Sequence, residues 1–318
     1  MLRLIIALLK IKGIGNSFIK KNLNIFQLEE EEVKKQLFQI SHKITPEIIN
    51  KNLFQADNLI NRCKFLGVDI VSIIDPMYPQ SLLDLSDPPA ILFLLGKKEL
   101  LTKKKIAVIG TRKASKLGET IASRVGEYFA KNYSICNGLV DGIDSASINT
   151  PQGISHNIIG ILSAGLNYKE TTNKRTRERA ELVLQNNGLL ISELEPDQRE
   201  DQFSGSKASR IQAGLSDALI LIQSSLSGGS KYTIKAFSGL DRVVGIIEFP
   251  TNEEYNNEET FSANRLINEN GLNGIMKFCS YKTTKNLRIR SLIRIRGIED
   301  YHLIEDKLLS NHIRPTLF

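Results

Sequence analysis

The chain has 318 residues, of which 41% are hydrophobic and 24% are charged, as in soluble globular proteins with well-formed cores. Its formal net charge of +7 favours an anionic partner, although a lysine-rich composition alone often produces such a value. The three cysteines, Cys63, Cys136 and Cys279, lie far apart and have no histidine pair nearby, which argues against a disulfide framework and against a zinc site.

Residues 1 to about 65 have the pattern of a small helical domain of the SAM or helix-hairpin-helix type. The apolar run at residues 4–9 is too short to cross a bilayer and is followed by Lys10, so we expect a cytoplasmic protein. Gly13-Ile14-Gly15 then predicts a tight turn between two helices, and the neighbouring lysines favour contact with DNA phosphates. A purely structural helical hairpin fits the same residues, and the sequence leaves both interpretations open.

Apolar runs alternate with amphipathic stretches from about residue 66 to residue 278. Amphipathic helices are predicted notably at Glu119–Asn132 and Lys174–Asn187. Because apolar strands that alternate with helices form a parallel sheet covered on both faces, we predict an α/β fold with an extended Rossmann-like, mostly parallel sheet. The predicted strands are Ile106–Ile109, Tyr133–Asn137, Ile158–Leu162, Gly188–Ile191, Ala218–Gln223 and Val243–Ile247.

The segment after the first of these strands, Gly110–Gly118, is the most informative part of the chain. Its glycines and small polar residues turn the chain towards a helix, and such a turn directs backbone N–H groups at one point, which suits a phosphate. The spacing is not the Gly-x-Gly-x-x-Gly of a dinucleotide site, and two cations suit a polyanion better than a buried cofactor. The predicted phosphate-binding residues here are Gly110, Thr111, Arg112, Lys113 and Ser115.

Two further glycine-containing loops follow predicted strands. In Asn137–Ala146, Gly138 and Gly142 permit close approach of the backbone, and Asp144 has the position of a helix cap. Because ligands of parallel sheets bind outside the carboxyl ends of the strands, we expect all three loops to converge on one site. The third loop, Ser225–Thr233, follows the predicted strand Ala218–Gln223. Its residues predicted to bind phosphate are Gly228, Gly229, Ser230, Lys231 and Thr233.

Several motifs occur in a fixed order over about residues 66 to 275. Gly110–Ser115 is similar to a Gly-Ser-Arg-x-x-Ser loop, and Asn137–Asp144 to Ser-Gly-Leu-Ala-x-Gly-Ile-Asp. Both loops belong to the DprA/Smf family of DNA-processing proteins, which this chain resembles as a divergent member. Similar family motifs occur at Asp75–Leu82, Asp87–Phe93, Ser192-Glu193, Arg210–Ser216 and Asn264–Ile267.

The resemblance implies a protein that binds single-stranded DNA, forms a homodimer and loads a RecA-type recombinase during DNA uptake, transformation and recombination. It implies no enzymatic turnover, no cofactor and no metal. A single strand needs a cationic groove with surfaces on which bases can stack. Lys207 and Arg210 join the predicted phosphate contacts, and Phe203 is a candidate for stacking, although a loop phenylalanine is packed against the domain at least as often.

The chain also departs from the family pattern. Ala146-Ser147 replaces Ala-His, and Ala208-Ser209-Arg210 replaces Arg-Asn-Arg, so that one arginine of two remains beside Lys207. The resemblance extends to nucleotide-processing phosphoribohydrolases of the same superfamily. Such an enzyme needs a carboxylate near the ribose, and Glu193 is the candidate for it. A sensor that binds a nucleotide-derived signal in the same loops is a third alternative.

Residues 279–318 form a small basic C-terminal extension, after the helical segment 1–65 and the Rossmann-like segment 66–278. Alternation in Leu287–Arg296 predicts a strand with Arg288, Arg290, Arg294 and Arg296 on one face, and with Leu287, Ile289, Ile293 and Ile295 on the other. Such a strand suits a nucleic-acid backbone. It equally suits a sheet edge that is protected by charge against aggregation.

Overall fold

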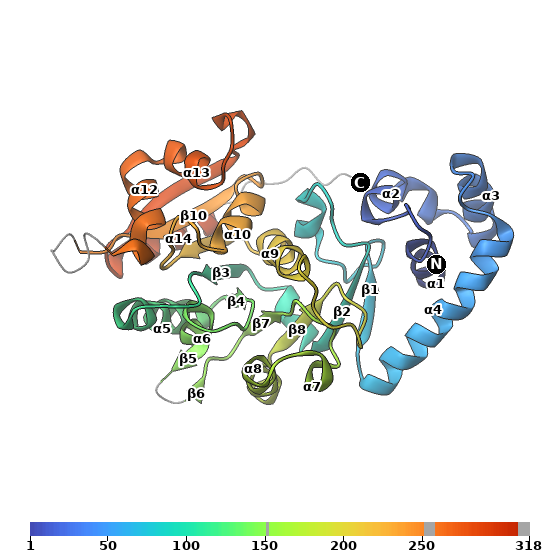
Figure 1. The fold of residues 1–318 in the computed structure, drawn as a ribbon, viewed down its shortest axis with the longest axis horizontal. Coiled ribbons are helices and arrows are strands. Elements are labelled where there is room, and N and C mark those ends of the chain that lie inside the picture. The colour runs from blue at the N-terminus through green and yellow to red at the C-terminus, as the bar shows by residue number, and fades with distance from the viewer. Residues whose placement is uncertain (151–152, 251–257, 311–318) are drawn as a thin grey trace.

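The computed structural model describes residues 1–150, 153–250 and 258–310 (Figure 1). A nine-stranded sheet runs through the molecule, and its seven strands from β8 to β11 are parallel, whereas β1 and β2 are antiparallel. The spatial order is β1 (Asp69–Ser72), β2 (Ile91–Gly96), β8 (Leu189–Ser192), β7 (Ile158–Ile161), β4 (Ser134–Asn137), β3 (Lys105–Ile109), β9 (Ala218–Leu221), β10 (Arg242–Ile247) and β11 (Ile289–Ile295).

All six predicted strands form, and the mostly parallel α/β fold is confirmed. Their apolar runs are buried on both faces, as expected for parallel strands between two helical layers. The run at Ala218–Gln223 ends as a strand at Leu221, and beyond it the side chain of Gln223 accepts from Ser115 N and donates to Thr260 Oγ1. The sequence also predicts an acidic, asparagine-rich loop at Thr251–Thr260, of which residues 251–257 lie outside the described residues.

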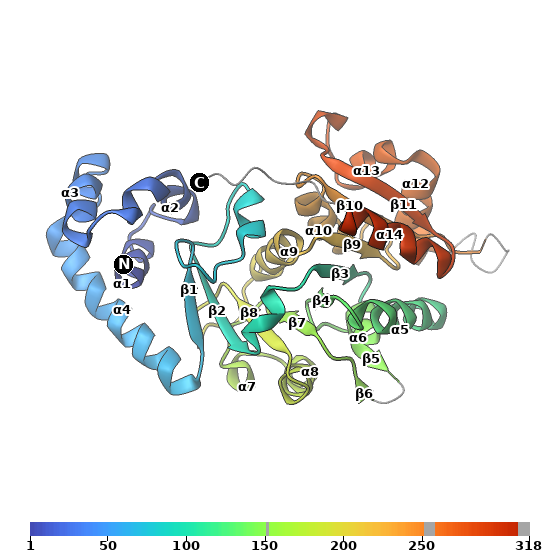
Figure 2. The same cartoon turned by 180° about the vertical axis from the view of Figure 1, so that it is seen from behind.

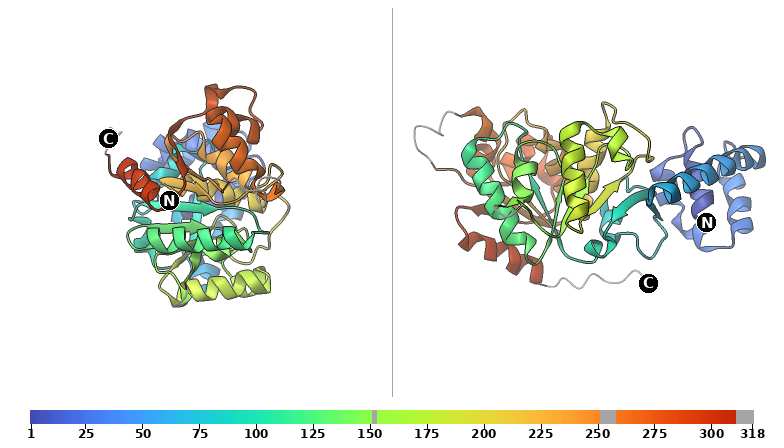
Figure 3. Two further views of the ribbon diagram at one scale, coloured as in Figure 1. Left: turned by 90° about the vertical axis from the view of Figure 1, so that its left-hand side faces the viewer. Right: turned by 90° about the horizontal axis from the view of Figure 1, so that it is seen from below.

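Helices cover both faces of the sheet (Figure 3). One layer contains α5 (Lys116–Ala130), α6 (Ile143–Ile148) and α8 (Lys174–Gln185), and the other contains α9 (Ser204–Leu215), α10 (Ser230–Phe237), α12 (Ser262–Asn270) and α13 (Leu272–Phe278). From β3 the chain adds β4, β7 and β8 in one direction, and α9 then returns it to β9 beside β3. Ligands of open α/β sheets bind where the strand order reverses in this way.

The helical segment consists of α1 (Leu2–Leu9), α2 (Asn16–Lys21), α3 (Glu30–Ile40) and α4 (Pro46–Leu66). Thr45 caps α4 by accepting a hydrogen bond from Ile48 N, and Gly67 ends it with a φ of 68°, in the left-handed region that glycine adopts readily. The interior positions of α1 are fully buried against α4. This apolar contact is what orders a short first helix.

The turn Gly13–Gly15 directs α2 at the sheet domain. Asn16 Nδ2 donates to Glu193 Oε1 at 2.6 Å, and Ser17 Oγ donates to Asp87 Oδ1 at 2.9 Å. Two of the nearby lysines are used likewise: Lys10 pairs with Glu195, and Lys20 Nζ donates to the carbonyl oxygens of Leu83 and Leu85. Protein groups therefore occupy the surface that could have met DNA, which favours the structural interpretation of the hairpin.

Two buried polar side chains fix the ends of the central strands. The guanidinium of Arg242 donates to three carbonyl oxygens at the C-terminal end of α9 and, at 2.9 Å, to the Asp84 carboxylate. Asn264 donates to the carbonyl oxygens of Ile222 and Ile247 and accepts from Ser224 N at 2.9 Å. These contacts hold α9 and α12 against the ends of β9 and β10.

The sheet continues into the C-terminal extension that we predicted at residues 279–318. β11 pairs in parallel with β10 as the edge strand, and α14 (Glu299–Leu309) lies against both strands (Figure 2). The Tyr128 ring of α5 lies 5.0 Å from the Tyr301 ring of α14, and its hydroxyl donates to Glu305 at 2.8 Å. The domain limits that we predicted at residues 65 and 278 stay predictions.

The predicted arginine face of β11 is wrong, because the pairing between β10 and β11 shifts by one residue. Arg242 pairs with Ile289, but Val243 pairs with Ser291, and such a bulge moves all later side chains to the other face. Leu287 and Ile289 accordingly join one apolar cluster, and Ile293 and Ile295 join the other. Three of the arginines meet carboxylates, as expected of a charged edge: Arg290 meets Asp241, and Arg294 and Arg296 meet Glu248.

A candidate nucleic-acid interface at the strand ends

The loops that follow β3, β4 and β9 surround a cavity of about 710 Å³, here called the strand-end cavity. One side of it is formed by α9 and by the start of α10. Of the residues predicted from the sequence, Gly110, Thr111, Arg112, Gly138, Phe203, Gly229, Ser230 and Thr233 line this cavity.

Backbone hydrogen bonds hold the three loops together. Thr111 N donates to the carbonyl oxygen of Gln223 at 2.7 Å, and Thr111 O accepts from Ile143 N at 3.1 Å. At Gly142, with a φ of +78°, a Cβ would lie 2.3 Å from Thr111 O, so that only glycine allows the second loop to approach the first. The first loop is therefore fixed from both sides.

Two of the predicted serines use their hydroxyl groups within the protein. Ser115 caps α5 by accepting from Gly118 N at 3.1 Å, and its own N–H donates to Gln223 Oε1 at 3.0 Å. Ser230 Oγ is buried and lies 2.7 Å from Ser224 Oγ. Gly228 packs so closely that a Cβ there would lie 2.4 Å from Ser224 Oγ. These residues shape the loops, and their side chains are not free for a ligand.

Arg112 occupies the central position of the site. Its exposed side chain lines the strand-end cavity and also two neighbouring cavities of about 870 Å³ and 110 Å³. Within residues 1–150, 153–250 and 258–310, no hydrogen-bond or ion-pair partner holds its guanidinium. An exposed cation without a fixed partner is suited to phosphate.

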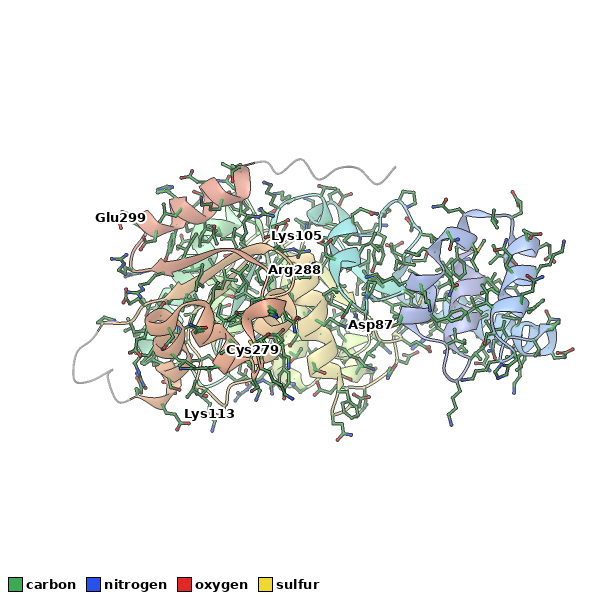
Figure 4. The ribbon with its side chains drawn as sticks, turned by 90° about the horizontal axis from the view of Figure 1, so that it is seen from above. Asp87, Lys105, Lys113, Cys279, Arg288 and Glu299 are labelled. Carbon is green, nitrogen blue, oxygen red and sulfur yellow. The ribbon has the colours of Figure 1, made fainter. Side chains whose placement is uncertain are left out.

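The three predicted lysines, Lys113, Lys207 and Lys231, lie outside the lining of the strand-end cavity. Lys113 lies at the outer edge of the molecule and lines the 870 Å³ cavity (Figure 4). Lys207 is exposed on α9, and Lys231 Nζ lies 5.4 Å from the centre of the Tyr232 ring. None of these three lysines lines the strand-end cavity itself.

Arg210 has a different environment from the one we predicted. Its guanidinium pairs with Glu193 and lies 3.8 Å from the carboxylate of Asp87. Figure 4 shows Asp87 between the sheet domain and the helical segment. Only 17% of its side chain is exposed. Since Glu193 also accepts from Asn16, Arg210 belongs to the contact that docks the helical segment on the sheet domain.

Phe203 lies at the rim of the strand-end cavity, immediately before α9. Its residue exposure of 60% is high for a phenylalanine, and its N–H donates to Asp201 Oδ1 at 2.8 Å. The same carboxylate accepts from Ser204 Oγ, which fixes the turn into the helix. The ring is thus held at the cavity mouth without being packed into the core.

Asp144 is the functional-site residue that the sequence analysis misassigned. It does not cap α6, whose N-cap is Gly142; its Oδ2 instead accepts from Gly138 N at 2.7 Å and closes the loop after β4. Burial raises the pKa of this carboxyl to about 7, although the N–H groups of Gly138 and Val140 and the charge of Arg112 act in the opposite direction. A buried carboxyl that titrates near neutral pH thus forms part of the wall of the strand-end cavity.

Other functions would need reactive thiols, a group of metal ligands or a long apolar helix. Burial raises the pKa of the thiols of Cys63, Cys136 and Cys279 to about 12, so that they stay protonated. Among residues 1–150, 153–250 and 258–310, no group of three His, Cys, Asp or Glu side chains could hold a metal ion. In the same ranges no helix combines the length and the apolar character needed to cross a membrane.

Comparison with known proteins gives consistent matches. The family model of the DNA recombination-mediator protein A matches residues 69–277. The DNA processing protein DprA of Streptococcus pneumoniae is 29% identical over 227 residues, which cover 71% of this chain and 79% of that protein. The Bacillus subtilis DprA is 29% identical over 180 residues, or 55% of this chain and 58% of that protein.

Two solved structures share the fold. That of the Streptococcus pneumoniae DNA processing protein A has a TM-score of 0.68 and 23% identity, over 95% of this chain and 98% of that one. That of the Helicobacter pylori DNA processing protein A, described for its single-stranded DNA binding mode, has a TM-score of 0.58 and 20% identity, over 76% of this chain and 97% of that one.

The titration of Asp144 predicts a pH dependence of stability. Because its folded pKa lies above the ordinary value of 3.8, the folded protein retains a proton that the unfolded chain has released, and stability falls as the pH rises from about 4 through about 7. The Asp144→Asn variant lacks this ionisation. Relative to the parent, it should gain up to about 1.4 kcal/mol of unfolding free energy per pH unit in that window.

Urea unfolding at several pH values measures this difference. Asp306→Asn, a substitution on the exposed face of α14, is the matched control and should show no such trend. A gap between parent and Asp144→Asn that stays constant with pH would contradict the assignment.

Proposed function

Because this chain belongs to the DNA recombination-mediator protein A family, which includes the DprA and Smf proteins, we propose that it binds single-stranded DNA in the strand-end cavity. The observation that carries the proposal is the position of Arg112, an exposed and unpaired cation in the part of the chain that the structure describes, at the meeting point of three cavities. Its role would be DNA processing during transformation and recombination, by protecting single strands.

The form of the cavity supports a single strand over a duplex. Arg112 suits a phosphate, while Phe203 at the rim offers a face on which an unpaired base can stack. In a duplex the bases are stacked inside the helix and cannot reach such a ring. The solved Helicobacter pylori protein of the same fold is described for single-stranded DNA binding, which agrees with this proposal.

The set of contacts is smaller than the sequence suggested. We propose direct contacts from the members of the predicted set that line the cavity, with the charge supplied by Arg112 and with stacking on Phe203; these members are Gly110, Thr111, Arg112, Gly138, Gly229, Ser230 and Thr233. Lys113, Lys207 and Lys231 would attract the strand from outside the cavity. Arg210 is engaged by Glu193, so it would act on DNA only through the position of α9.

The Arg112→Ala variant tests the proposal. Loss of one phosphate contact should weaken binding of single-stranded DNA about tenfold at moderate salt, similarly for all sequences, and should reduce the slope of log affinity against log salt by about 0.7. Fluorescence anisotropy with a labelled oligonucleotide measures both quantities.

Lys64→Ala is the control for Arg112→Ala, because it removes an exposed positive charge on α4, far from the cavity. It should change affinity less than about twofold. Unchanged binding by Arg112→Ala, or equal affinity for duplex and single-stranded DNA, would overturn the proposed site.

The resemblance to the family extends the proposal to a cytoplasmic homodimer that loads a RecA-type recombinase on the bound strand. Light scattering after gel filtration should then give twice the chain mass of 35.6 kDa. The protein should also accelerate assembly of recombinase on single-stranded DNA that is covered by a single-strand binding protein. A monomer at micromolar concentration, or the absence of acceleration, would remove the corresponding part of the proposal.

We propose that the chain binds without catalytic turnover. The phosphoribohydrolase alternative required Glu193 near a ribose, but this carboxylate is paired with Arg210 and Asn16 and does not line the strand-end cavity. We expect no release of free base from nucleoside monophosphates when the purified protein is analysed by chromatography. Base release that Asp144→Asn abolishes would instead identify Asp144 as a catalytic group.

A further inference from the structure

A second large cavity lies on the other side of Arg112, between α5, α6 and α8. Its volume is about 870 Å³, and we call it the α5 cavity. Cations outnumber carboxylates in its lining, and no aromatic ring is among the described residues that form it. The cations are Arg112, Lys113, Lys116, Arg124, Arg175 and Arg179, and the carboxylates are Glu119, Glu127 and Asp141.

The cations of the α5 cavity fall into two groups. Arg175 Nη1 lies 2.9 Å from the Asp141 carboxylate, which also pairs with Arg179, so one carboxylate fixes both arginines. Lys116 and Arg124 are exposed on α5, and no ion pair or side-chain hydrogen bond is found for them in the described parts of the chain. These two side chains are available to an anion from outside.

The positions on α5 form a track. Lys116, Thr120 and Arg124 follow one another at intervals of four residues, so they share one face of the helix, and the ends of this track are about 12 Å apart along the axis. Arg112 lines both the strand-end cavity and the α5 cavity, and therefore connects them. Because Lys116 and Arg112 both line the α5 cavity, a strand that leaves the strand-end cavity over Arg112 enters the space that Lys116 also lines.

We propose that the face of α5 between Lys116 and Arg124 is a second binding subsite, which holds the sugar-phosphate backbone of a single strand beyond the strand-end cavity. The subsite rests on the proposed function, because it takes the same strand. Without an aromatic ring it binds phosphates independently of sequence. Glu119 and Glu127 in the same lining reduce its attraction for one phosphate, so it acts on a strand that is already anchored at Arg112.

The test uses strand length as its variable. The double variant Lys116→Ala/Arg124→Ala should bind an oligonucleotide of about five nucleotides as the parent does, because such a strand fills only the strand-end cavity. For an oligonucleotide of about 25 nucleotides its affinity should fall at least about tenfold, and its salt slope should fall by about 1.4, as expected for two lost contacts to a single strand.

The control is Lys51→Ala/Lys64→Ala, which removes two exposed positive charges from α4. It should leave the affinity for both lengths within about twofold of the parent. Thermal unfolding of both double variants verifies that the fold is intact, which is expected because all four side chains lie on helix surfaces.

The outcomes distinguish a failure of the proposed strand-end site from a failure of the proposed α5 subsite. Equal weakening for short and long strands would place Lys116 and Arg124 in the first site and overturn a separate subsite, and so would unchanged binding of both lengths. If Arg112→Ala has no effect while the α5 variant weakens long strands, the strand-end site fails and the α5 surface stands alone. Binding of inorganic phosphate by the parent that the α5 variant abolishes would show a free-anion site in place of a strand path.

Discussion

The site depends on how closely the loops after β3, β4 and β9 approach one another. At Gly142 a Cβ would lie 2.3 Å from Thr111 O, and at Gly110 it would lie 2.5 Å from a side-chain carbon of Ile143. Side chains at these positions would separate the loops and open the wall of the cavity. The close approach also buries Asp144, and this burial raises the pKa of its carboxyl, although the loop amides that bind it act in the opposite direction. The close approach of the loops thus accounts both for the shape of the cavity wall and for the raised pKa of Asp144.

Long-range polar contacts hold the helices that complete this arrangement. Arg242 fixes the C-terminal end of α9, and Asn264 fixes α12 against the ends of β9 and β10. The Arg210–Glu193 pair, together with Asn16, attaches the helical segment beside α9. Arg210, the one arginine that remains of the family's Arg-Asn-Arg, therefore serves as a docking residue. Arg112 and the residues at the start of α5 line the α5 cavity, and we propose that they supply the positive charge for the strand.

Local sequence patterns predicted much of the fold, and their failures have physical reasons. The six predicted strands of the parallel sheet were found because each is a short apolar run that is buried. Such a run can be recognised from a few consecutive residues. The face of β11 was predicted wrongly because a bulge depends on the partner strand β10, which alternation within one segment does not reveal. Asp144 was taken for a helix cap because a carboxylate after a glycine fits that role, but its partners are loop amides on its N-terminal side.

The sequence by itself determined the α/β architecture, the family and the positions of three glycine-containing turns at the strand ends, because apolar period and turn residues act over a few positions. Only the tertiary structure decided which charged residues remain free. Lys10 and Arg210 find carboxylates far along the chain, whereas Arg112 finds none among the described residues, and Lys116 and Arg124 share its surroundings. Ion pairing depends on distance in space, and for residues that are far apart along the chain this distance is set only when the chain has folded.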